Sequence, residues 1–315
     1  MKIVSIINYK GGVGKTSITA NLGAELAWRN YNVLLIDLDP QTSLTFSFIN
    51  PDEWEKRFLK SNTIKDWFDS FESGEVKLLK DLIFVPERVN ARLKDKGKLH
   101  LIPSHLGLIN VDLELATQMG GSNLKQTKKN YIKIHRRLAN GINKFNQDDF
   151  DVILIDCPPN FNIVTKNAIV ASDFILIPAK PDYLSTLGID YLKRNVNELV
   201  RDFNEYVDVD DGSEINKIDP KVLGVIFNMI QIYANVPIST IRPFIKQTKK
   251  LGIPVFDSFV RENKSLFGDS PQYGIPVILN AYNNNQTFKG IVKEMEEFVT
   301  EFIKKSNIKN GNTRN

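Results

Sequence analysis

One stretch decides the fold of this chain, Asn8-Tyr9-Lys10-Gly11-Gly12-Val13-Gly14-Lys15-Thr16-Ser17. The apolar run at residues 3–7 precedes it and is typical of a buried strand, and Ile18, Leu22 and Leu26 follow it at helical spacing. Strand, glycine-rich turn and helix are the context of a phosphate-binding loop, where backbone N–H groups and the helix N-terminus bind phosphate oxygens. The sequence therefore predicts a nucleotide-binding α/β domain.

Within this loop each residue type has a physical role. The backbone of Gly11, Gly12, Val13, Gly14 and Ser17 would approach the phosphates, Lys15 would reach the β- and γ-phosphates, and the Thr16 hydroxyl would bind Mg²⁺. Tyr9 stands where the general P-loop pattern has its first glycine, and Lys10 is followed directly by two glycines. This K-G-G-V-G-K-T form, called the deviant Walker A motif, is more specific than the general pattern. Its specificity disfavours the alternative, a glycine turn with two solvated lysines.

The composition fits one globular α/β domain. The chain has 315 residues and a net charge of +4, and no run approaches the roughly 18 apolar residues of a membrane span. Cys157 is the only cysteine, which excludes an intramolecular disulfide, and we expect it to be a small packed residue. The three histidines share no ligand spacing. We therefore expect a cytoplasmic protein, without a signal peptide.

Strand-like apolar runs alternate with helical patterns along the chain. This alternation predicts a doubly wound, mostly parallel sheet with helices on both faces, and ligands bind at the carboxyl ends of such strands. The loops after Ile7, Leu38 and Ile155 should therefore converge. The runs lie at residues 3–7, 33–38, 99–103, 152–156, 174–178 and 222–228, with a weaker one at 253–256.

Two of these runs end in carboxylates. Val33–Leu38 contains Asp37 and is followed by Asp39, and the run 152–156 ends at Asp156 before Cys157-Pro158-Pro159. Beside a P-loop, such carboxylates can hold Mg²⁺ through water or orient the attacking water. The alternative is that Asp37 caps a loop and Asp39 is solvated. We expect Asp156 to act on the Mg²⁺ shell.

Taken together, these motifs resemble the ParA/MinD group of deviant Walker ATPases. The resemblance rests on residues 8–17, on Asp37-Leu38-Asp39-Pro40-Gln41 and on Ile155-Asp156-Cys157-Pro158-Pro159-Asn160. Three further segments resemble the ParA branch and occur in the expected order. They are Leu101–Leu106 with the helix that follows, Phe174–Gly188, and Ser270-Pro271-Gln272-Tyr273-Gly274-Ile275-Pro276-Val277.

The resemblance implies roles for particular residues. Lys15 and the backbone of residues 11–16 bind phosphates, and Thr16 binds Mg²⁺. Asp39 matches the aspartate needed for hydrolysis, while Asp37 and Asp156 surround the metal. Lys10 matches the signature lysine that crosses a dimer interface to the partner's nucleotide. Asn228 stands where the family places a residue that contacts the base.

The resemblance also implies contacts with DNA. The family has basic residues just before its "AP-S-YG-KP" segment, and Arg261 and Lys264 fall nearby, with Lys246, Lys249 and Lys250 close in sequence. A second candidate is the cluster at residues 125–137, which lies within a stretch, 122–144, that contains seven Lys or Arg and no Asp or Glu. There Tyr131, Ile134, Leu138 and Ile142 form an inward face and leave most of the cations outside. An ordinary solvated helix explains this second cluster equally well.

The remaining segments complete a single domain at residues 1–305. Residues from about 50 to 98 have no clear strand and are expected to form inserted short helices and loops. Apolar residues at helical spacing over 288–303 predict a core-facing terminal helix, with a membrane-binding helix as the alternative. A disordered polar tail is expected at 306–315.

The sequence thus predicts a ParA-type ATPase that uses ATP and Mg²⁺. It would form a homodimer when ATP is bound, bind double-stranded DNA non-specifically on the nucleoid, and respond to a ParB-like adaptor, so as to partition a plasmid, chromosome region or other cargo. Hydrolysis would be slow alone and faster with the adaptor. A MinD-type membrane-associated regulator is the alternative, but residues 308–315 lack a basic, apolar targeting helix. An enzyme resembling nitrogenase iron protein would need two cysteines per subunit, and this chain has one.

Overall fold

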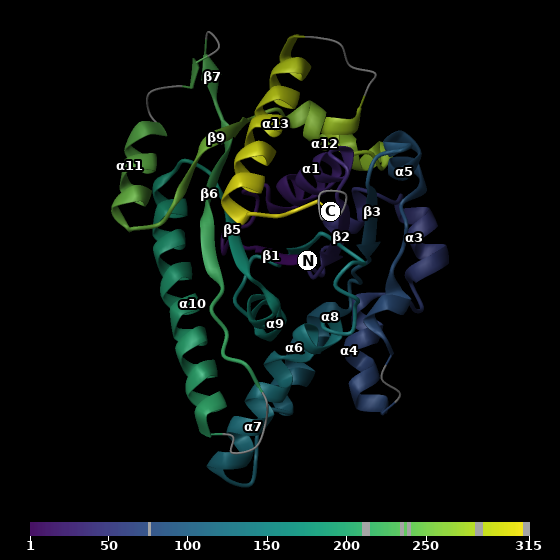
Figure 1. The fold of residues 1–315 in the computed structure, drawn as a ribbon, viewed down its shortest axis with the longest axis vertical. Coiled ribbons are helices and arrows are strands. Elements are labelled where there is room, and N and C mark those ends of the chain that lie inside the picture. The colour runs from purple at the N-terminus through teal and green to yellow at the C-terminus, as the bar shows by residue number, and fades with distance from the viewer. Residues whose placement is uncertain (75–76, 210–214, 234–235, 238–240, 281–285, 311–315) are drawn as a thin grey trace.

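The computed structural model describes residues 1–74, 77–209, 215–233, 236–237, 241–280 and 286–310. A sheet of seven parallel strands runs through the domain in the order β3-β2-β4-β1-β5-β6-β9 (Figure 1). This confirms the expected doubly wound fold. The strands are β1 (Lys2–Ile6), β2 (Asn32–Asp37), β3 (Lys98–Ile102), β4 (Val152–Asp156), β5 (Phe174–Ala179), β6 (Lys221–Ile230) and β9 (Val255–Arg261). A short antiparallel pair, β7 (Ile232–Tyr233) and β8 (Val236–Pro237), stands apart from the sheet.

The central strands are mostly apolar because helices cover both faces of the sheet. In β2, Val33 and Leu35 pack into one hydrophobic core, whereas Leu34 and Ile36 pack into the other. Successive side chains of a strand point to opposite faces, so one continuous run of apolar residues supplies two cores.

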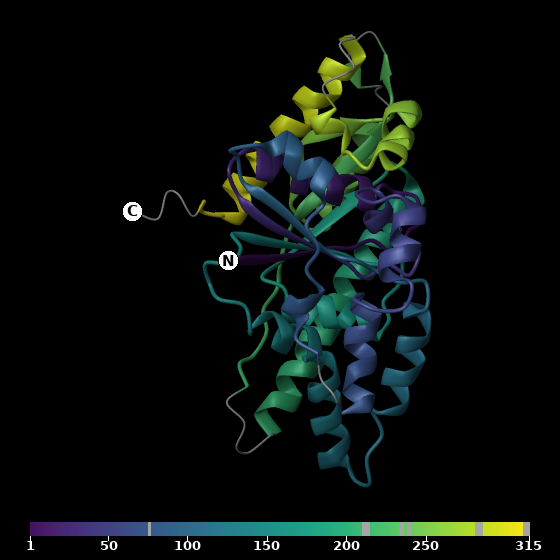
Figure 2. The same cartoon turned by 90° about the vertical axis from the view of Figure 1, so that its right-hand side faces the viewer.

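Two groups of helices cover the two faces (Figure 2). The face that receives Val33 and Leu35 is covered by α1 (Lys15–Trp28), α5 (Glu87–Leu93) and α13 (Gln286–Ser306). The opposite face is covered by α4 (Ile64–Ser73), α6 (Leu108–Thr117), α7 (Leu124–His135), α8 (Arg137–Ile142), α9 (Ile163–Ala171) and α10 (Tyr183–Val209). The remaining described helices are α2 (Ser43–Phe46), α3 (Pro51–Phe58), η1 (Leu79–Leu82), α11 (Arg242–Lys250), α12 (Lys264–Tyr273) and η3 (Val277–Leu279).

The last strand is protected by carboxylates from α13. Glu301 accepts hydrogen bonds from the backbone N–H groups of Asp257 and Ser258, and Glu294 accepts one from the N–H of Arg261. An edge strand otherwise presents unpaired N–H groups to other chains. These contacts fix α13 against β9, where its apolar face is buried.

Two expectations change in detail. The weak apolar run at 253–256 corresponds to β9, which begins at Val255 and continues to Arg261. The tail expected to be disordered from Ser306 is packed as far as Asn310: Ile308 is buried, and the Asn310 side chain donates to the carbonyl of Arg29. The apolar Ile308 explains this packing. The rest of that tail, 311–315, lies outside the described residues. No described helix is both long enough and apolar enough to span a membrane.

Candidate functional site

The loops that follow β1, β2 and β4 meet at one edge of the sheet, because these three strands are neighbours in the order β2-β4-β1. Together they enclose a cavity of about 460 Å³. The cavity is lined by residues of these loops, of α1 and of α2, together with one residue each from β6 and α12. The lining residues are Gly11, Gly12, Gly14, Lys15, Thr16, Ser17, Ala20, Asn21, Asp39, Gln41, Ser43, Ser47, Pro159, Met229 and Phe267.

Asn8 organises the glycine-rich loop. Its side chain accepts a hydrogen bond from the Lys10 N–H and donates one to the Pro178 carbonyl, at the end of β5. Its own carbonyl accepts from Lys15 Nζ at 3.2 Å. This buried residue therefore joins the loop to a neighbouring strand. Sequence reasoning gave Asn8 no role, because its partner Pro178 lies 170 residues away.

Lys15 lies at the start of α1 with little exposed surface. Burial lowers the pKa of Lys15 below its usual range, and the nearby Asp156 and Asp39 carboxylates counter only part of that effect. Among the described residues, its hydrogen-bond partner is a carbonyl rather than a carboxylate. An anion in the cavity would give this desolvated charge the counter-charge it needs.

Thr16, Thr19 and Asp156 form a hydrogen-bonded group beneath the loop. Thr16 donates to one Asp156 oxygen at 2.8 Å and Thr19 donates to the other at 3.1 Å. Burial raises the pKa of Asp156 to about 7, although these hydrogen bonds and the Lys15 charge oppose the shift. A cation beside this carboxylate would favour its ionised form.

The donor set fits Mg²⁺ bound together with phosphates. Mg²⁺ takes one or two protein oxygens and completes its shell with phosphate oxygens and water, and Thr16 and Asp156 offer a hydroxyl and a carboxylate. The described residues include no group of three or more His, Cys, Asp or Glu that could hold a metal alone.

The two aspartates after β2 have different surroundings. Asp37 is completely buried, and its oxygens accept hydrogen bonds from the Asp39 N–H, the Thr45 N–H and the Thr45 hydroxyl. Burial and the neighbouring Asp156 carboxylate hold the pKa of Asp37 well above its usual range. Asp39 instead lines the cavity, with one oxygen accepting from the Gln41 N–H. Asp37 thus organises the loop, whereas Asp39 faces the ligand space.

Lys10 lies beside the cavity in an ion pair. Its ammonium is 2.7 Å from Asp182 Oδ2, at the loop that leads into α10, and both side chains are about two-fifths exposed or less. Burial alone would raise the pKa of Asp182, but hydrogen bonds from Lys10 and Ser185 outweigh it and lower that pKa. Sequence reasoning assigned no role to Asp182, whose partner lies 172 residues away.

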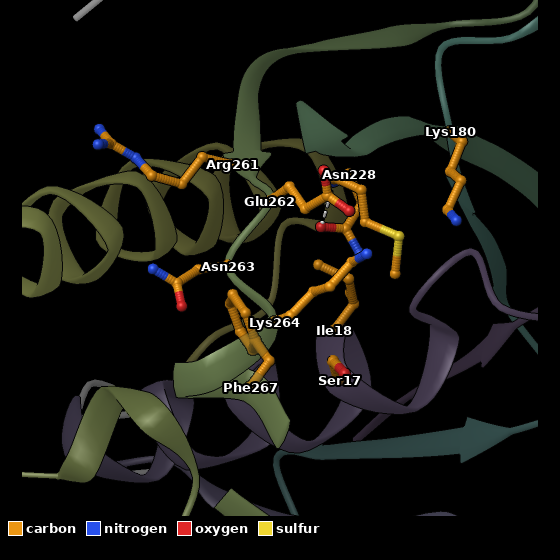
Figure 3. Close-up of a pocket in the computed structure, with 10 residues that line it drawn as sticks. Ser17, Ile18, Lys180, Asn228, Arg261, Glu262, Asn263, Lys264 and Phe267 are labelled. Carbon is orange, nitrogen blue, oxygen red and sulfur yellow. Dashed lines mark hydrogen bonds between the residues drawn. The ribbon is translucent and has the colours of Figure 1, made fainter. Parts of the chain in front are cut away.

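A smaller pocket of about 160 Å³ adjoins the cavity (Figure 3). Ser17, Ile18, Asn228, Lys264 and Phe267 are among its lining residues. Asn228, predicted to contact a base, is buried at this pocket, and its amide nitrogen donates to the Val13 carbonyl at 3.1 Å. The fold therefore places Asn228 against the phosphate loop itself.

The basic residues predicted to contact DNA have unequal surroundings. Arg261 points away from Asn228 and Ile18 in Figure 3, and its guanidinium pairs with Glu294 at 2.6 Å. Both side chains of that pair are largely buried. Lys264 is exposed at the start of α12. Lys246, Lys249 and Lys250 are exposed on α11 together with Arg242. We call these four residues of α11 the α11 basic surface.

The second basic cluster is less available than its sequence indicates. Ile134, Leu138 and Ile142 are buried as expected, but Arg137 is also buried, and its guanidinium lies over the Phe71 ring. α7 ends at His135, Arg136 has φ −93° and ψ 0°, and α8 begins at Arg137. Lys128 is paired with Glu205 at 3.5 Å.

Comparison with known proteins agrees with this geometry. The model of the AAA domain family matches residues 1–209. A protein of unknown role from Methanocaldococcus jannaschii is 30% identical over 81% of this chain and 91% of its own. The sporulation initiation inhibitor protein Soj of Bacillus subtilis is 27% identical over 88% of this chain and 90% of its own.

The fold is also found in a solved structure. A plasmid partition protein of Borrelia burgdorferi, solved with AMPPNP, superposes with a TM-score of 0.65 over 96% of this chain and 99% of its own, at 22% identity. The chain belongs to the AAA domain family and, within it, to the ParA-type P-loop ATPases.

Proposed function

We propose that this protein binds ATP with Mg²⁺, dimerises, binds DNA non-specifically and hydrolyses ATP to drive partition or positioning of a plasmid, a chromosome region or another cargo. The observation that carries the proposal is the cavity in which Lys15, Thr16 and Asp39 meet the glycine-rich loop, with Lys10 at its side. The Bacillus relative that matches most of this chain is named for sporulation control, and the Borrelia neighbour is a plasmid partition protein with a bound ATP analogue.

Phosphate binding would use charge and pre-formed donors. The N-terminus of α1, which begins after the left-handed Gly14, directs backbone N–H groups and a partial positive charge at the cavity. Lys15 would move its ammonium from the Asn8 carbonyl to the β- and γ-phosphates. Thr16 and Asp156 would hold Mg²⁺, which neutralises charge on the transferred phosphoryl group. Asp39 would orient the attacking water.

Dimerisation would send Lys10 to the nucleotide of the partner subunit. In the single subunit Lys10 is held by Asp182, so this pair must open before the lysine crosses. Because the pair is partly exposed, its opening costs only about 1 kcal/mol or less. ATP in the partner would offer Lys10 a larger negative charge than one carboxylate.

DNA binding would use the α11 basic surface and Lys264. Exposed lysines bind phosphates as point charges and release counterions, without reading sequence. The membrane-binding alternative is disfavoured, because the apolar face of α13 is buried: Phe298 and Phe302 have no exposed surface. The adaptor and the cargo would then set where hydrolysis releases the protein from DNA.

The test uses Asp39→Ala, which removes the water-positioning group but leaves the phosphate-binding loop. With ATP this variant should show a doubled mass by light scattering and bind duplex DNA, whereas ATP turnover should fall at least tenfold. Lys15→Ala is the matched control and should remain monomeric with ATP. Normal turnover in Asp39→Ala would refute the role of Asp39, and DNA binding that is absent in every state would refute a role in partition.

A further inference from the structure

The Asn228 side chain contacts the backbone of the phosphate loop, although Asn228 lies on β6 and the loop follows β1. Asn228 lies near the end of β6, separated from β1 by β5, and only 4% of its surface is exposed. Its amide nitrogen donates to the Val13 carbonyl at 3.1 Å, and its amide oxygen accepts from the Met229 N–H at 2.8 Å. Both polar atoms of this side chain are therefore already bound to backbone.

The backbone on both sides of the amide has an uncommon conformation. Met229 has φ +57°, a left-handed conformation that costs a non-glycine residue about 1 kcal/mol. Gly14 has φ +84°, and a Cβ atom added there would lie 2.0 Å from the Asn228 amide nitrogen. The amide thus packs directly on the Gly14 α-carbon, where no other residue type would leave room. The Asn228 side chain therefore contacts both Gly14 and Met229, two residues with left-handed backbone conformations.

From this geometry we infer that Asn228 is a positioning residue for the phosphate loop, an inference that rests on the proposed binding of ATP. In a planar trans peptide the C=O and the following N–H point in opposite directions. The hydrogen bond to the Val13 carbonyl therefore fixes the direction of the Gly14 N–H, which belongs to the same peptide group. Gly14 lines the cavity proposed to receive the phosphates.

This role differs from recognition of a base, the role predicted for Asn228 from the family resemblance. If Asn228 only contacted the base, its substitution would not change the affinity for a ligand that has no base. A residue that orients the loop affects every ligand that carries the phosphates. Because Asn228 also lines the smaller pocket beside Ile18 and Phe267, an occupant of that pocket would contact the side chain that orients the loop.

The experiment compares ATP with inorganic tripolyphosphate, both with Mg²⁺, by calorimetry. Asn228→Ala should weaken both ligands about tenfold, the effect of losing roughly one hydrogen bond. Ile18→Val is the control: Ile18 lines the smaller pocket but not the phosphate cavity, so this shorter side chain should weaken ATP at most a few-fold and leave tripolyphosphate unchanged. If Asn228→Ala weakens ATP alone, or neither ligand, the positioning role is overturned. If the wild type binds neither ligand, the proposed ATP binding itself fails.

A second measurement needs no ligand and remains informative even where Asn228→Ala folds poorly. Asn228→Asp keeps the shape and the acceptor for the Met229 N–H but loses the donor to the Val13 carbonyl. In the ligand-free protein, hydrogen exchange of the Gly14 amide should become several-fold faster in this variant, while exchange of the β1 amides stays unchanged. An unchanged Gly14 rate in a folded variant would overturn the inference.

Discussion

The phosphate-binding cavity and the α11 basic surface both depend on lysines, but the fold treats those lysines in opposite ways. Lys15 is buried, has a lowered pKa and is held by the Asn8 carbonyl. Lys246, Lys249 and Lys250 are exposed on one short helix. A buried charge needs the surrounding structure to compensate its desolvation, so its position is specified by many residues. The position of an exposed charge depends on almost no other residue.

This difference teaches how each region should respond to mutation. In the cavity, one substitution removes a charge that no other side chain replaces. On the α11 basic surface, each lysine adds a similar and partly redundant contribution. Substitutions should therefore have their largest effects in the cavity and smaller effects at the exposed charges.

Lys15→Met should give the largest effect, a loss of ATP affinity of at least 100-fold, because hydrogen bonds to charged groups each contribute about 1.5–3 kcal/mol. Its ligand-free form should melt at a higher temperature than the wild type. The lowered pKa means that the folded state binds the lysine proton less tightly than the unfolded state, so at pH 7 this charge opposes folding. Calorimetry and thermal unfolding measure the two effects.

The matched control for that variant is Lys10→Met. Lys10 is outside the cis phosphate loop contacts, so monomeric ATP binding should persist. Normal ATP binding by Lys15→Met would contradict the assignment of the cavity as the phosphate-binding site. The contrast between the cavity and the α11 basic surface would then no longer hold.

Charge reversal of the α11 basic surface should give the next effect. Lys246→Glu, Lys249→Glu and Lys250→Glu together should weaken binding to every duplex sequence and make the log–log salt dependence shallower by about 0.9 for each phosphate that the variant no longer neutralises. ATP binding should be unchanged. The control reverses Lys125, Lys129 and Lys133 on α7, which lies at the lower end of the molecule in Figure 1, whereas α11 lies at the upper left. If only the α7 variant fails to bind DNA, the wrong surface was chosen.

Arg261→Gln should separate a structural arginine from a DNA contact. It leaves Glu294 without its ion pair in a largely buried place, so unfolding free energy should fall by about 2 kcal/mol, measured by urea denaturation. The salt dependence of DNA binding should stay at the wild-type slope. Lys264→Gln should do the reverse, since this lysine is exposed. A shallower slope in Arg261→Gln with unchanged stability would restore Arg261 to the DNA surface.

The sequence predicted the sheet and the phosphate loop because their signals are local. Apolar runs of strand length, their alternation with helices, and the order of glycines around Lys15 are all contained in short windows. The convergence of the loops after β1, β2 and β4 followed from the topology of parallel sheets. The roles predicted for Thr16, Asp39 and Asp156 stay predictions, but the fold brings these three residues together at the cavity.

What the sequence did not predict depends on pairing between distant residues. Whether Arg261 is free or bound depends on Glu294, and whether Lys10 is free depends on Asp182. The burial of Arg137 depends on its packing over the Phe71 ring of α4, 66 residues earlier in the chain. Such contacts are set by how whole elements pack, and one sequence carries no direct signal for them.

The smallest effect is expected at Lys10, a lysine that is neither fully buried nor freely exposed. Asp182→Asn removes the charge that holds Lys10 in the single subunit, so the ATP-dependent dimer should form a few-fold more readily, as expected for a partly exposed ion pair. Because the pKa of Asp182 is lowered, its carboxylate stays ionised at neutral and mildly acidic pH. Lowering the pH from 8 to 6 should therefore not reproduce the variant in the wild type.

Sedimentation of the Asp39→Ala background, with and without Asp182→Asn, measures this shift without interference from hydrolysis. Ser185→Ala is the matched control, because the Ser185 N–H donates to Asp182 and its hydroxyl lies 3.5 Å from the Lys10 ammonium, yet Ser185 carries no charge. It should change dimerisation less than Asp182→Asn does. Weaker dimerisation in Asp182→Asn would show that the closed dimer itself uses this carboxylate. In that case the ion pair between Lys10 and Asp182 would stabilise the closed dimer rather than restrain Lys10 in the single subunit.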